Sequence, residues 1–156
     1  MSSYDESEFV TDPGLALREP ALQSLLALWN AKRGAKAMPA RADFDVADLR
    51  PHLGHLVLVD VLRPEMRFRY RLIGVEVTRR VGRDSTGKYL DELYAPEQYD
   101  RVIVAYRWVT QQCRPIRVEA TLRHAHREWM RIESLDLPLS RDGESVDMIM
   151  SRPVFL

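Results

Sequence analysis

The residues most suggestive of chemistry form a glycine-rich loop, Gly82 to Lys88, which matches the spacing G-x-x-x-x-G-K. In that pattern, backbone N–H groups cradle phosphates, the lysine reaches the outer phosphates, and a following Ser or Thr holds magnesium. The next residue here is Tyr89, whose phenol cannot replace that hydroxyl. Glycines that end short helices are the simpler interpretation, and a nucleotide-binding enzyme that uses residues 82–88 is kept as an alternative.

Four histidines and one cysteine are the candidates for metal ligation or nucleophilic chemistry. His52 and His55 are three residues apart, while His124 and His126 fall at an expected hairpin tip. No acidic third ligand accompanies either pair, so we expect surface histidines and no metal site. Cys113 is interpreted as a small buried hydrophobic residue. No catalytic grouping is recognisable, and we therefore expect no enzymatic activity.

A third candidate site is a row of arginines in one predicted strand. Arg67, Arg69 and Arg71 alternate with apolar residues, so their side chains are expected to project from one face. One interpretation is a solvated, charge-mixed sheet surface. The other is a docking face for a partner protein or for the acidic N-terminal residues Asp5, Glu6 and Glu8.

The composition is that of one globular domain. The chain has 156 residues, of which 46% are hydrophobic and 29% charged, with 23 basic and 23 acidic side chains. This balance gives no net field toward nucleic acid or anionic lipid, so neither is an expected partner. No apolar run approaches the roughly 20 residues that span a bilayer, and the N-terminus lacks the layout of a secretory signal. We expect a cytoplasmic protein with no membrane partner.

The N-terminal part of the chain predicts an arm followed by a helix. Residues 1–18 are polar and aperiodic and are expected to form a flexible arm before a single domain over residues 19–156. The helix is predicted to begin at Pro20 and to end at Gly34. Its wide apolar stripe predicts spare apolar surface for a homodimer contact, formed by Leu22, Leu25, Leu26, Leu28 and Trp29.

The rest of the chain predicts an α+β domain. Residues 55–62 predict a strand covered on both faces, paired in a hairpin with residues 66–72. One long helix is predicted over residues 96–113, followed by three strands with a bulge near Glu133 and a two-residue turn at Asp142-Gly143. These elements predict a five-stranded, mainly antiparallel sheet with helices on one face and an N-terminal helix.

The order of elements and four short strings resemble the PAS sensory-domain superfamily, specifically a bacterial branch in which a PAS domain stands almost alone. The strings are Leu28-Trp29 with Arg33-Gly34, residues 38–41 (MPAR), residues 68–74 (FRYRLIG) and residues 82–93 (GRDSTGKYLDEL). The resemblance implies the PAS fold and a role in sensing or protein interaction. It also implies a ligand pocket between sheet and helices, which maps here to Tyr70, Leu72, Ile103, Tyr106, Met130, Ile132 and Met148.

The same resemblance disfavours two cofactors. Flavin-binding relatives carry a cysteine in a polar signature on a central helix, and Cys113 fits neither that position nor that context. Haem-binding relatives use a helix histidine, and no histidine lies between residues 74 and 113. The leading hypothesis is a non-enzymatic sensory or adaptor module that acts through a partner protein, since no output domain follows. The main alternative is a receptor for a small metabolite.

Overall fold

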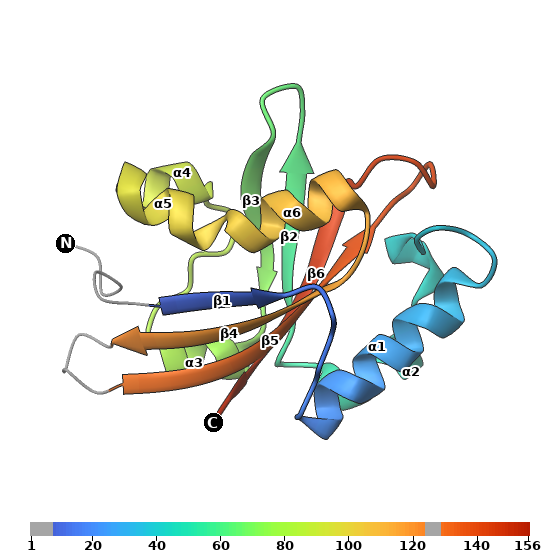
Figure 1. Ribbon diagram of the computed structural model, residues 1–156, viewed down its shortest axis with the longest axis horizontal. Coiled ribbons are helices and arrows are strands. Elements are labelled where there is room, and N and C mark those ends of the chain that lie inside the picture. Colours follow the sequence, from blue (N-terminus) through green and yellow to red (C-terminus); the bar gives the residue numbers. More distant parts are fainter. Residues whose placement is uncertain (1–7, 124–128) are drawn as a thin grey trace.

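The computed structural model describes residues 8–123 and 129–156. One six-stranded sheet is flanked by helices on both faces (Figure 1). In chain order the elements are β1 (Glu8–Asp12), α1 (Pro20–Arg33), η1 (Arg41–Asp43), α2 (Val46–Leu49), η2 (Arg50–His52), β2 (Val57–Leu62), β3 (Arg67–Ile73), α3 (Val75–Val81), α4 (Leu90–Leu93), α5 (Pro96–Val102), α6 (Val104–Gln112), β4 (Ile116–Arg123), β5 (Trp129–Leu139) and β6 (Met148–Phe155). The α+β fold class predicted from the sequence is confirmed, but the helices cover both faces of the sheet and not the single face that was expected (Figure 1).

The sheet is antiparallel throughout, in the order β1-β4-β5-β6-β2-β3. Its five predicted strands are present, and β1 is an additional one. Residues 8–12 pair with β4, from Glu8 opposite Thr121 to Asp12 opposite Arg117. The prediction of a flexible arm is therefore wrong for this segment, because its backbone completes the ladder at the edge of β4.

The two faces of the sheet have different covers. We call the face that carries Val118 and Ser134 the inner face, and the face that carries Arg117 and Glu133 the outer face. Helix α6 lies over the inner face, whereas α1 packs against the outer one (Figure 1). The indole Nε1 of Trp29 in α1 donates to a backbone carbonyl of β5, at 2.9 Å.

The bulge predicted near Glu133 is absent from β5. The apolar residues of this strand change phase from Ile132 to Leu135, but its pairing with β4 and β6 runs without a shift in register. Ile132 lies on the inner face, and Leu135, Leu137 and Leu139 lie on the outer face, where they are fully buried. The phase changes because the buried face changes along the strand. The observed irregularity lies in the β2–β3 ladder, between Leu58 and Val59.

The start of α1 is held by a buried ion pair. Arg117 and Glu133 are diagonal neighbours on the outer face of the β4–β5 ladder, with Arg117 Nε 2.7 Å from a Glu133 oxygen. The same carboxylate accepts the backbone N–H groups of Arg18 and Glu19. Burial opposes its ionisation, but these N–H donors and the arginine outweigh burial and lower the pKa of Glu133. The helix then begins at Pro20, as predicted.

Two further predictions differ from the structure. The long helix over residues 96–113 is broken at Ile103, whose φ of −91° and ψ of 0° separate α5 from α6. The turn at Asp142 belongs to a longer connection between Leu139 and Met148 rather than to a two-residue hairpin. The Asp142 carboxylate accepts the backbone N–H groups of Glu144 and Ser145 there, which lowers its pKa.

Candidate functional site

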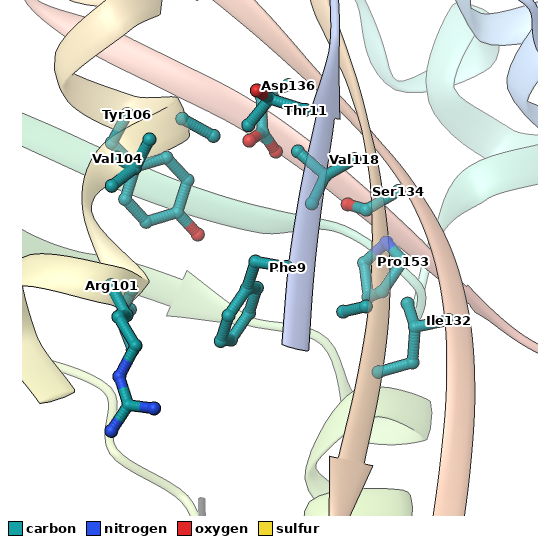
Figure 2. Close-up of a pocket in the computed structure, with 13 residues that line it drawn as sticks. Phe9, Thr11, Arg101, Val104, Tyr106, Val118, Ile132, Ser134, Asp136 and Pro153 are labelled. Atoms are coloured by element: carbon teal, nitrogen blue, oxygen red, sulfur yellow. The ribbon is translucent and has the colours of Figure 1, made fainter. Parts of the chain in front are cut away.

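A cavity of about 150 Å³ lies between the inner face of the sheet and the α5–α6 pair (Figure 2). We call it the α6 cavity. Its walls come from β1, α5, α6, β4, β5 and β6, so residues from both ends of the chain meet around it. The lining residues are Phe9, Thr11, Arg101, Val102, Val104, Ala105, Tyr106, Val118, Ala120, Ile132, Ser134, Asp136 and Pro153.

The body of the α6 cavity is apolar. The Phe9 ring of β1 projects toward the middle of the cavity, and Val118, Ile132 and Pro153 line its opposite side (Figure 2). Sheet pairing fixes this arrangement, because Phe9 stands opposite Ala120 and Ala120 opposite Ile132. The small Ala120 side chain between two larger ones leaves part of the space open.

The inner end of the α6 cavity is polar. Asp136 of β5 is 3% exposed, and its Oδ1 accepts a hydrogen bond from Ser151 Oγ at 2.6 Å. Burial raises the pKa of Asp136 from 3.8 to about 6. Burial also raises the pKa of Tyr106 well above 10, with the nearby Asp136 charge as the next cause. The cavity therefore combines an apolar body with a carboxylate that titrates near neutral pH.

Five of the seven residues predicted for the pocket lie on the inner side, and two of them line the cavity. Tyr106 and Ile132 are in its wall. Met130 packs against the small apolar cluster around Ile132. Tyr70 and Ile103 do not line the cavity. The Tyr70 hydroxyl is hydrogen-bonded to the Tyr94 hydroxyl at 3.3 Å, and Ile103 is buried at the break between α5 and α6.

Leu72 and Met148 do not face the cavity, contrary to the prediction. Leu72 stands opposite Leu58 beyond the irregularity in the β2–β3 ladder, so its side chain lies on the outer face and is 44% exposed. Met148 stands opposite Asp60, and Asp60 bonds Arg69 on that same outer face. The predicted phase of the last strand was wrong because Met148 and Met150 lie on the outer face, where Met150 is fully buried and Met148 is half-buried.

The contributions of β1 and of Asp136 to the cavity are not among the predictions from the sequence. Phe9 and Thr11 were assigned to an arm, although their spacing of two residues is the signal of a strand with one buried face. Asp136 alternates with the outer-face leucines of β5, and an acidic residue between apolar neighbours was the available clue to a buried carboxylate. Arg101 of α5 also lines the cavity (Figure 2).

The three strand arginines each contact an acidic group of their own chain. Arg67 forms two hydrogen bonds with Asp91, at 2.8 and 2.9 Å, and its guanidinium lies 3.8 Å from the centre of the Tyr89 ring. Asp60, which is 7% exposed, lies 2.9 Å from Arg69 and 3.8 Å from Arg71. The row therefore has local counter-charges, and Arg71 is its most exposed member.

The N-terminal acidic residues cannot all serve as that counter-charge. Glu8 belongs to β1, which lies at the opposite end of the sheet from β3. Asp5 and Glu6 lie outside the described residues. The prediction that this acidic segment folds onto the arginines is therefore wrong for Glu8.

The residues predicted for a dimer contact divide into two groups. Leu22, Leu25 and Trp29 are 0%, 0% and 4% exposed because α1 buries them against the outer face of its own sheet. They are not available to a second chain, contrary to the prediction. Leu26 and Leu28 are half-buried at the border of the same core. Dimerisation itself stays a prediction.

The glycine loop is a structural connection and not a phosphate cradle. Gly82 ends α3 in the left-handed conformation, with φ of 83°. The backbone N–H of Gly87 donates to Tyr70 O, and Lys88 O accepts from Tyr70 N–H, so the loop pairs with the edge of β3. The Asp84 carboxylate accepts the N–H and hydroxyl of Thr86. These contacts occupy backbone groups that a phosphate would need.

The other chemistry-bearing residues lie away from the α6 cavity. Cys113 ends α6, and its Sγ is 3.7 Å from the Glu144 carbonyl oxygen. His52 is buried on the outer side and is not the surface residue expected. His124 and His126 lie outside the described residues. Within residues 8–123 and 129–156, no group of three or more His, Cys, Asp or Glu side chains is arranged to hold a metal ion.

The sheet order, the helix cover and the inner cavity agree with one family of proteins. A family model described as PAS domain matches residues 17–151, which is most of the chain. The chain therefore belongs to the PAS domain family, and the resemblance found in the sequence is confirmed at that level. No curated protein matches it. Over the described residues, no helix combines the length and apolar character that crossing a membrane requires.

Two solved structures with TM-scores of 0.52 and 0.50 show the same fold at low identity. The LOV protein of Rhodobacter sphaeroides is 14% identical, with 90% of this chain and 69% of that chain aligned at a TM-score of 0.52. An RNA-binding light-oxygen-voltage receptor is 13% identical, with 96% of this chain and 39% of that chain aligned at 0.50. The PAS-B domain of Drosophila melanogaster Cycle with bound ethylene glycol is 11% identical, with 65% and 98% aligned at 0.47.

Proposed function

We propose that this chain is a non-enzymatic sensory PAS module that binds a small ligand in the α6 cavity and signals through a partner protein. The observation that carries the proposal is the cavity itself, with its apolar body and its buried Asp136. An engineered apolar cavity of about 150 Å³ binds benzene. A ligand with one aromatic or aliphatic ring is therefore the expected size.

The polar end of the cavity defines the ligand further. The Asp136 carboxyl accepts the hydrogen bond of Ser151 Oγ, so we expect it to act toward a ligand as an acceptor. A bound N–H or O–H group of the ligand supplies a second hydrogen bond beside that of Ser151. We therefore propose a ring-sized ligand with a hydrogen-bond donor, such as an amine or a phenol, and no negative charge.

We propose neither flavin nor haem as the ligand. All thirteen residues that line the cavity lie in the described part of the chain, and none is a cysteine or histidine. The cavity is also smaller than the roughly 300–1,000 Å³ typical of pockets for larger ligands. These observations support a ligand of modest size without redox chemistry.

The partner is proposed to bind the arginine row on β3. Arg71 supports this, because its side chain is 61% exposed and its guanidinium is only at the limit of ion-pair distance from Asp60. An acidic partner associates faster with such a surface, and that increase in rate falls as the salt concentration rises.

A cytoplasmic location and a homodimer that uses Leu26 and Leu28 belong to the same proposal. Light scattering at micromolar concentration tests the dimer, and a strictly monomeric mass contradicts it.

The ligand proposal is tested with phenol and aniline as probes, added to purified protein and followed by calorimetry and by protein NMR. Replacing Ala120 with Met fills the cavity from β4 and is expected to abolish binding. The same substitution at Ala27, on the exposed side of α1, is the matched control. Failure of both probes to bind the wild type, or equal binding by the Ala120→Met variant, contradicts the proposal.

Native mass spectrometry of freshly purified protein separates the two forms of this function. A copurified molecule that remains bound indicates the metabolite receptor of the alternative hypothesis. A protein that is isolated empty and binds the probes reversibly indicates the sensory module.

A further inference from the structure

A second pocket, of about 210 Å³, lies on the outer side of the sheet between α3 and the end of β6. We call it the α3 pocket. It shares Pro153 with the wall of the α6 cavity, but its other residues differ. The lining residues are His55, Glu76, Arg80, Arg152, Pro153, Val154 and Phe155.

Arg152 is the unusual member of this set. It is 8% exposed, and over the described residues it has no carboxylate within ion-pair distance. Its Nε is buried without a hydrogen-bond partner. Arg117, on the same face, is buried to a similar extent but contacts Glu119 at 2.5 Å and Glu133 at 2.7 Å. A guanidinium stays charged in proteins, so an unpaired buried one is costly unless an anion joins it.

His52 positions this guanidinium without neutralising it. Arg152 Nη1 contacts His52 Nδ1, and because an arginine only donates, that ring nitrogen accepts. The ring is therefore neutral. Burial, followed by the Arg152 charge, lowers the pKa of His52 to about 4, so the pair keeps its single positive charge at neutral pH.

Two further donors face the α3 pocket from different elements. Arg80 comes from α3, where its guanidinium lies 5.4 Å from the centre of the Phe155 ring, and His55 comes from the segment before β2. The pocket also contains the carboxylate of Glu76, which accepts a hydrogen bond from Arg79 at 3.0 Å. Because Arg79 already pairs with Glu76, Arg152 and Arg80 give the pocket an excess of positive charge.

We propose that the α3 pocket binds a phosphate group, free or carried by a small metabolite, with the guanidinium of Arg152 as one of its donors. The donors come from the sheet, from α3 and from the His55 segment, and a tetrahedral oxyanion has oxygens enough to bond donors from several elements. Charge-assisted hydrogen bonds from guanidinium groups are among the strongest that proteins form. The bound anion supplies the counter-charge that Arg152 lacks.

The experiment titrates the full chain with inorganic phosphate, glycerol phosphate and acetate, each against sodium chloride of equal ionic strength. The readouts are the melting temperature and the NMR resonance of the Arg152 Nε–H group. We expect saturable binding of at least one phosphate compound and a clear shift of that resonance. Tighter binding of inorganic phosphate indicates the free anion, and tighter binding of glycerol phosphate indicates a metabolite.

Variants identify the donors. Arg152→Gln is expected to abolish binding, and Arg80→Gln to weaken it about tenfold, the loss of one hydrogen bond to a charged group. Arg141→Gln, at an exposed position in the β5–β6 connection, is the matched control and is expected to bind as the wild type. Because Arg80 is exposed, its variant keeps the test valid if Arg152→Gln fails to fold. Equal effects of phosphate and chloride, binding of acetate as tight as phosphate, or unchanged binding by Arg80→Gln overturns the proposal.

Discussion

Replacing Asp136 with Asn is expected to change how stability depends on pH. The folded protein holds the Asp136 proton more tightly than the unfolded chain does, because burial raises the pKa from 3.8 to about 6. The stabilisation from this group is therefore complete below about pH 4 and is lost as the pH rises through 6. A rise of this size corresponds to about 3 kcal/mol. The neutral Asn does not titrate. The free energy of unfolding of the variant is therefore expected to rise by about 3 kcal/mol relative to that of the wild type as the pH is raised from 4 to 8.

Urea unfolding followed by tryptophan fluorescence, at several values between pH 4 and pH 8, measures this difference. His52 titrates in the opposite sense, since its lowered pKa makes the folded state less stable as the pH falls from above 6 toward 4. Both proteins contain His52, and its effect cancels in the difference. Asp100→Asn, at an exposed position of α5, is the control and is expected to follow the wild type. The free energy of unfolding of Asp136→Asn minus that of the wild type is expected to rise with pH. A difference that stays constant, or that falls as the pH is raised, refutes the reasoning.

Three other substitutions test the packing that surrounds the sites. Arg117→Met leaves Glu133 buried without its arginine and is expected to lower the free energy of unfolding by about 3–5 kcal/mol in urea; a loss below 1 kcal/mol contradicts this role. Gly74→Ala places a Cβ 2.3 Å from a backbone carbonyl oxygen and is expected to cost at least about 3 kcal/mol; a melting temperature equal to that of the wild type contradicts the close approach. Arg69→Met leaves the buried Asp60 with only the more distant Arg71 as a cation and is expected to lower the free energy of unfolding by about 1–2 kcal/mol. An unchanged urea midpoint would show that Arg69 does not stabilise the fold.

Local signals predicted the elements whose ends are set by local chemistry. Pro20 and Gly34 delimit α1 because proline suits the first helical position and glycine accepts a positive φ at the end. The break at Ile103 has no such marker. The apolar positions of α5 and α6 continue at helical spacing across it, so periodicity predicts one helix where tertiary packing makes two.

The site was less predictable than the fold because its residues come from pairings distant in sequence. The family resemblance placed Tyr106 and Ile132 correctly on the inner side of the sheet. It placed Met148 on the wrong face, since the last strand is buried on both sides and alternation alone does not distinguish them. Arg152 and His52 are 100 residues apart, and no local pattern indicates that they meet.

The position of β1 has a practical consequence for anyone who trims the chain. The family match begins at residue 17, and β1 ends at Asp12. A chain shortened to the family boundary would lose the Phe9 side of the α6 cavity, and β4 would become an open sheet edge. The eight-residue edge of β4 would then replace the five-residue edge of β1. A longer unpaired edge recruits strands from other molecules more readily, so the shortened protein is expected to aggregate more readily. Ligand screens on this domain should keep residues 8–16.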